Sequence, residues 1–80
     1  MSGRRAEAEA AYREVYKAHR KAIKENSGAH ARREELGFSS PEWLDAHGAY
    51  MLANVRLSCA SDALREAGDR VLALIARGVK

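Results

Sequence analysis

The sequence predicts an all-α protein with a long N-terminal helix, a short connecting helix and a long C-terminal helix, arranged as a helical hairpin or bundle that dimerisation completes. Much of the hydrophobic content, 46% of the chain, is alanine, the strongest helix former. Apolar residues recur at spacings of three and four over long stretches, as in amphipathic helices. No run of β-branched and aromatic residues alternates with a period of two, so strands are not expected.

The length of the chain limits how it can be stabilised. Its 80 residues predict one domain, 1–80, with a modest core. Short chains often add disulfides, metals or oligomerisation. Cys59 is the only cysteine, so no intramolecular disulfide can form, and no Cys and His residues show zinc spacing. We therefore expect oligomerisation or a larger partner to complete the core, without a metal or cofactor.

The N-terminal half predicts two helices, at about 4–26 and 29–36. The first ends at Asn-Ser-Gly, where Gly28 suits a left-handed cap, and the second ends at Gly37. At about 100° per residue, one side of the first helix carries an apolar stripe that we expect to face the core. The stripe consists of Tyr12, Val15, Tyr16, His19, Ala22 and Ile23.

A start signal for the third helix lies at residues 38–43, Phe-Ser-Ser-Pro-Glu-Trp. Ser39 and Glu42 have the spacing of a capping box. Phe38 and Trp43 are spaced as a hydrophobic staple, and the chain's one proline falls in the first turn. These signals predict a helix over about 40–77.

This C-terminal helix carries two apolar faces. The first occupies its first half and consists of Leu44, Gly48, Met51, Leu52, Val55 and Cys59, the cysteine being expected as a small buried residue. The second is a heptad seam in which small and large residues alternate. The seam consists of Ala53, Leu57, Ala60, Leu64, Ala67, Val71 and Leu74, and we expect it to form a helix–helix or dimer contact.

A helix with two apolar faces needs two packing partners. The N-terminal helix can cover one face, and a second, antiparallel copy of the chain is the simplest cover for the other. In the alternative, the helix breaks within 58–62, with Ser61 as a new N-cap, and the chain is a three-helix monomer. We favour the continuous helix, in which Gly68 is tolerated because the seam runs through it to Leu74.

Positive charge is concentrated in the N-terminal half. Residues 1–33 hold nine Lys or Arg and four Glu, a balance of +5, whereas residues 34–80 hold five basic and seven acidic residues, a balance of −2. A cationic stripe lies on the side of the first helix opposite the apolar stripe. It consists of Arg13, Lys17, Arg20, Lys21 and Lys24. The stripe is either a solvated helix face or a surface for an acidic partner.

The sequence lacks the patterns that identify an enzyme. It contains no glycine-rich phosphate loop, nucleophile elbow or paired carboxylate site, and its three histidines are not spaced as metal ligands. No secretory leader or membrane span is recognisable, which favours the cytoplasm. We expect a non-catalytic protein that binds macromolecules, as an adaptor, regulator or stoichiometric inhibitor of a protein with an acidic surface. The alternative is a nucleic-acid-binding protein whose cationic stripe contacts phosphates together with Arg4, Arg5, Arg32 and Arg33.

Overall fold

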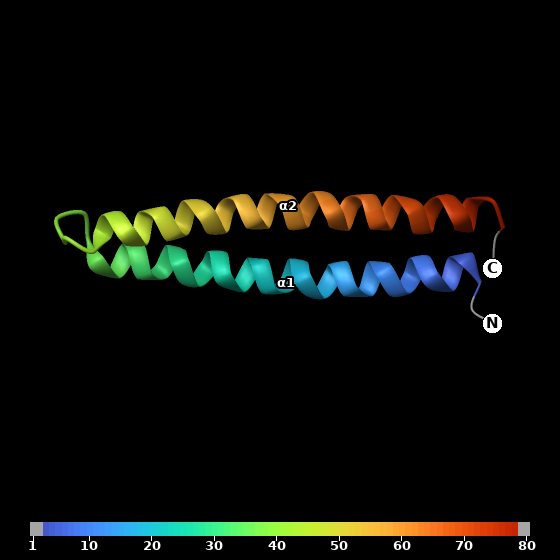
Figure 1. The fold of residues 1–80 in the computed structure, drawn as a ribbon, viewed down its shortest axis with the longest axis horizontal. Helices are drawn as coiled ribbons and strands as arrows, with labels where there is room; N and C mark the ends of the chain where they lie inside the picture. Colours follow the sequence, from blue (N-terminus) through green and yellow to red (C-terminus); the bar gives the residue numbers. More distant parts are fainter. Residues whose placement is uncertain (1–2, 79–80) are drawn as a thin grey trace.

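The chain forms an antiparallel hairpin of two long helices (Figure 1). A computed structural model describes residues 3–78, in which α1 spans Arg4–Leu36 and α2 spans Trp43–Ala76. The hairpin measures 58 × 18 × 12 Å, and its Cα radius of gyration is 17.8 Å. A compact domain of this length would have a radius of gyration of about 12 Å. The all-α hairpin predicted from the sequence is confirmed, in a strongly elongated form.

The predicted division of the N-terminal half into helices at 4–26 and 29–36 is wrong. Residue 28 does not take the left-handed conformation, and α1 continues through it to Leu36. A glycine inside a helix costs only about 1 kcal/mol relative to alanine. Contacts with α2 on both sides of Gly28 offset this cost. Asn26 Nδ2 donates a hydrogen bond to Asn54 Oδ1, and the rings of His30 and Tyr50 lie 5.4 Å apart.

The turn between the helices begins where the sequence predicts. Gly37 ends α1 with φ 72° and ψ 152°, a conformation that essentially only glycine adopts. The predicted contact between Phe38 and Trp43 is present, since their rings are 4.9 Å apart, although Trp43 is the first residue of α2 and not the fourth. Nevertheless, Phe38 remains 82% exposed.

The start of α2 differs in detail from the prediction. The helix begins at Trp43, not at residue 40, and the serine that contacts Glu42 is Ser40, not Ser39. The Ser40 hydroxyl accepts a hydrogen bond from the Glu42 backbone N–H at 3.3 Å and donates one to the Glu42 carboxylate at 2.6 Å. The residues at 40–42 lie in turns before the helix, the N-cap of α2 is Glu42 without a side-chain cap hydrogen bond, and the capping box predicted at Ser39 is therefore wrong.

The C-terminal helix is continuous, as predicted. Neither the segment 58–62 nor Gly68 interrupts α2, which ends at Ala76. A Cβ atom built on Gly68 would lie 3.4 Å from a Tyr12 ring carbon, so the glycine allows the tyrosine ring to lie against α2. The absence of a side chain here serves the contact between the helices.

Both helices contribute a heptad to the interface between them. Apart from Glu9, the buried and half-buried positions of α1 from residue 8 to 36 follow the 4-3 spacing of a coiled coil. These positions are Ala8, Tyr12, Val15, His19, Ala22, Asn26, Ala29, Arg33 and Leu36. Two members of the predicted core stripe, Tyr16 and Ile23, lie outside this heptad and are 44% and 46% exposed.

Polar pairs mark the register of the hairpin. Three such pairs link α1 to α2: His19–Ser61, Asn26–Asn54 and Arg33–His47. In each pair the two residues are equally far in sequence from residue 40, and successive pairs are seven residues apart. His19 Nε2 and Ser61 Oγ are 3.1 Å apart, and Arg33 donates to His47 Nδ1 at 3.2 Å. Polar residues at heptad positions commonly fix the register of paired helices, at some cost in stability.

The core of the hairpin is thin. Within residues 3–78 the buried hydrophobic residues are Ala8, Ala22, Ala46, Ala53 and Leu74. Alanines let the helices approach closely but bury little apolar surface, and hydrophobic stabilisation scales with that surface. One hairpin alone therefore has a small hydrophobic contribution to its stability. In the same residue range, neither helix combines the length and the apolar character needed to cross a membrane.

Candidate binding surfaces

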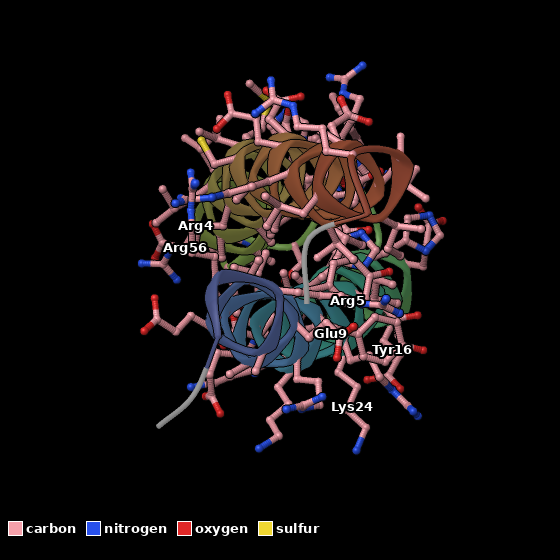
Figure 2. All side chains as sticks on the ribbon, turned by 90° about the vertical axis from the view of Figure 1, so that its right-hand side faces the viewer. Arg4, Arg5, Glu9, Tyr16, Lys24 and Arg56 are labelled. Atoms are coloured by element: carbon pink, nitrogen blue, oxygen red, sulfur yellow. The ribbon has the colours of Figure 1, made fainter. Side chains whose placement is uncertain are left out.

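The cationic surface, defined as Arg13, Lys17, Arg20, Lys21 and Lys24, lies on α1. All five side chains are exposed. Helical periodicity places four of them opposite the face that packs on α2, with Lys21 beside them. Figure 2 shows Lys24 extending from α1 on the side away from α2. The surface spans about three turns of helix, or about 17 Å, since the rise is about 1.5 Å per residue.

Little negative charge neutralises this surface. Lys17 lies 3.4 Å from Glu14, and both side chains are about three-quarters exposed. Such a pair contributes little, because water screens it. Within residues 3–78 the other four cations form no ion pair. Like charges also lie four residues apart at Arg13–Lys17 and Arg20–Lys24, which slightly destabilises the helix. The surface thus carries a net positive field.

A shallow groove adjoins the cationic surface and adds apolar contacts to it. The groove has a volume of about 690 Å³. It is lined by Tyr16, His19, Arg20, Lys21, Ile23, Lys24 and Leu64. Tyr16 and Ile23 are the two residues that α2 leaves nearly half exposed, and Tyr16 stands at one side of the hairpin (Figure 2). The lining of the groove therefore combines apolar side chains with three cations of the cationic surface.

Aromatic and histidine side chains cluster at the loop end of the hairpin. The Trp43 and His47 rings stack with centroids 4.7 Å apart, and the Arg33 guanidinium lies 4.3 Å from the centre of the Tyr50 ring. Arg33 also contacts Glu34 at 3.1 Å. At the other end, Arg5 pairs with Glu9 at 2.9 Å. Two of the arginines expected to assist phosphate binding are thus engaged within the chain.

A seven-residue spacing of Tyr12, His19, Asn26 and Arg33 is present in the sequence, but the break predicted at Gly28 concealed it. In the structure these residues face the polar and glycine positions of α2. The cluster secures the turn and leaves Arg33 half-buried.

An apolar surface occupies the first half of α2 on the side away from α1. It is defined by the six residues Leu44, Gly48, Met51, Leu52, Val55 and Cys59, all of which are exposed. Its four largest side chains are 50–72% exposed. Cys59 is a free thiol at this surface, so the expectation that it is buried is wrong. This is the face that the sequence predicts to need a second partner.

The heptad seam lies on the opposite side of α2. Ala53 and Leu74 are buried, and Leu57, Ala60, Leu64, Ala67 and Val71 are half-buried. Ala60 and Ala22 line one groove between the helices, and Ala67 and Val15 line another. The seam residues therefore face α1 of the same chain, and the six apolar residues on the other side of α2 remain uncovered.

No arrangement for catalysis or metal binding is evident among residues 3–78. No group of three or more His, Cys, Asp or Glu side chains is placed to hold a metal ion there. No polar or charged side chain in that range is buried. Among residues 3–78 the one clear pKa shift is at Glu42, whose pKa is lowered first by the Ser40 hydroxyl and then by its own backbone N–H. That carboxylate lies at a helix start and has a structural role.

Comparisons with known proteins return no match. No family model matches the chain, and no curated protein or solved structure is significantly similar to it. The surfaces themselves are therefore the basis for a functional proposal.

Proposed function

We propose that this chain is a non-catalytic binding protein, an adaptor, regulator or stoichiometric inhibitor, whose α1 face docks on an acidic surface of a protein partner. The observation that supports the proposal best is the groove beside the cationic surface. Exposed Tyr16 and Ile23 lie next to Arg20 and Lys24 in one groove. Aromatic and apolar anchors beside positive charge suit an amphipathic acidic helix, which offers both kinds of contact.

A protein partner fits this face better than nucleic acid does. Phosphate binding needs several free cations, and most of its affinity is lost as salt rises. Arg5 forms an ion pair with Glu9. Arg33 contacts Glu34 and His47. The apolar side chains of the groove would add nothing to phosphate contacts, whereas they would retain a protein partner at physiological salt.

The proposal includes two further features. The exposed thiol of Cys59 fits a reducing compartment such as the cytoplasm. We also propose that the working form is a homodimer, because one hairpin leaves an apolar surface on α2 uncovered.

The proposal can be tested by titration with a fluorescent peptide of acidic amphipathic design, with Leu on one helical face and Glu on the other. We expect the double variant Arg20→Glu/Lys24→Glu to bind it at least about tenfold more weakly, because two charge contacts become repulsive. The matched control is Arg70→Glu/Arg77→Glu, which makes the same change in net charge near the C-terminal end of α2, Arg77 being its C-cap. It should retain binding.

Equal weakening by both double variants would contradict the proposal, since only net charge would then matter. A DNA duplex and an RNA hairpin should be titrated in parallel at about 50 mM and about 200 mM salt. Nucleic acid that binds more tightly than the peptide at the higher salt would favour the alternative function.

A further inference from the structure

The apolar surface of α2 has a two-fold symmetric pattern. Its six residues form three pairs, Met51–Leu52, Gly48–Val55 and Leu44–Cys59, each centred on the peptide bond between Met51 and Leu52. The members of the pairs are one, seven and fifteen residues apart. A two-fold interface requires a surface that is complementary to itself when the chain direction is reversed. This pattern meets that requirement along about 22 Å of helix.

We propose that a second copy of this chain docks on the apolar surface, with the two α2 helices antiparallel and the two-fold axis passing beside Met51 and Leu52. In this register Met51 lies opposite the partner's Leu52. Gly48 lies opposite the partner's Val55, so a position without a side chain receives a branched one. Leu44 lies opposite the partner's Cys59. Each contact occurs twice.

Charges beside the apolar surface select the same orientation. Asp45 and Arg56 are both exposed and, being eleven residues apart, lie on the same flank of α2. Arg56 extends from one side of the hairpin in Figure 2. Within residues 3–78 neither side chain forms an ion pair.

In the antiparallel register, Asp45 of one copy lies about 3 Å along the axis from Arg56 of the other. Two symmetric ion pairs can therefore form. In a parallel pair the two-fold axis would run along the helices and place this flank of the two copies on opposite sides of the contact, so neither ion pair could form.

The extent of the apolar surface also fits a second hairpin of this kind. Beyond Cys59 the same side of α2 turns acidic, with Asp62, Glu66 and Asp69 exposed. The contact therefore ends about halfway along the helix. The resulting dimer has four helices in the order α1, α2, α2, α1, with the two cationic surfaces facing outward on opposite sides. This inference does not depend on the partner of the cationic surface, but it makes the dimer bivalent for that partner.

The oligomeric state tests the inference first. Sedimentation equilibrium at tens of micromolar should show a dimer for the wild type and a monomer for Val55→Asp, which places a charge within the contact, opposite the partner's Gly48. The matched control is Leu72→Asp, at a residue that is 64% exposed and outside the apolar surface. It should remain dimeric. A monomeric wild type, or a Val55→Asp protein that stays dimeric while its helical circular dichroism is intact, would overturn the proposal.

Oxidative crosslinking tests the register. In the proposed dimer the two Cys59 thiols are about 22 Å apart along the axis, beyond the reach of a disulfide. Oxidised glutathione should therefore leave the wild type without a covalent dimer. Leu44→Cys should give a covalent dimer in which mass spectrometry finds position 44 joined to Cys59. A Cys59–Cys59 crosslink in the wild type, or no 44–59 crosslink in the variant, would contradict the antiparallel register.

Discussion

Replacing Gly28 by alanine should stabilise the protein, because α1 runs unbroken through this residue. A Cβ atom built at Gly28 meets nothing within 4 Å, so the substitution adds no steric cost. Alanine is more favourable than glycine inside a helix by about 0.5–1 kcal/mol. The expected rise in the free energy of unfolding is therefore about 0.5–1 kcal/mol. Domains of this length have total stabilities of about 4–12 kcal/mol, so the change is measurable.

The matched control for this prediction is Gly37→Ala, at the end of the same helix. With φ 72° and ψ 152°, Gly37 has a conformation that costs alanine about 1–3 kcal/mol. Both variants should be unfolded in urea and followed by circular dichroism at one protein concentration, because dimerisation would link stability to concentration. A Gly28→Ala protein that is less stable than wild type would refute the continuous α1 and restore the break predicted from the sequence.

Two further predictions concern the core and the turn. Leu74 is 6% exposed, and its change to alanine should lower the free energy of unfolding by about 2–5 kcal/mol. Leu72 is 64% exposed, and Leu72→Ala should change the free energy of unfolding by at most about 0.5 kcal/mol. Equal urea midpoints for the two variants would contradict the hairpin packing. The Ser40 hydroxyl holds the pKa of Glu42 below its usual value, so Ser40→Ala should raise that pKa in an NMR titration, and an unchanged pKa would exclude the hydrogen bond as its cause. Because the folded-state pKa is lowered, the stability that this carboxylate contributes is present at neutral pH and is lost as pH falls through the folded-state pKa.

The sequence was sufficient to predict the elements whose signals are local or strongly periodic. The seam from Ala53 to Leu74 predicted a continuous C-terminal helix, and glycine at position 37 predicted the end of the helix before the turn. The contact between Phe38 and Trp43 was likewise visible in their spacing.

Other features depend on contacts between distant residues and could not be predicted in the same way. Gly28 is helical because Asn26 and His30 on either side of it contact α2, which no local signal at residues 26–28 indicates. Tyr16 was assigned to the core because it is apolar and close in phase to Tyr12. In the structure most of the buried residues between the helices are alanines, and Tyr16 falls at the edge of the interface, 44% exposed.

The candidate surfaces could be predicted only in part, because they also depend on contacts between the two helices. Periodicity alone identified the cationic surface on α1 and the two apolar faces of α2. Periodicity could not tell which of the two apolar faces lies against α1. That choice depends on how the hairpin pairs its helices, as in the contact between His19 and Ser61. The groove beside Tyr16 also depends on this pairing, because Leu64 of α2 forms part of its lining.

The central claim is that the α1 face binds an acidic partner while the apolar surface of α2 is reserved for a second copy. Amide chemical shifts of ¹⁵N-labelled protein, measured while the unlabelled acidic amphipathic peptide is added, test this claim most directly. We predict that the largest changes fall within residues 13–24 and that residues 44–59 are nearly unchanged. Changes centred on residues 44–59, or no change at a large excess of peptide, would contradict it.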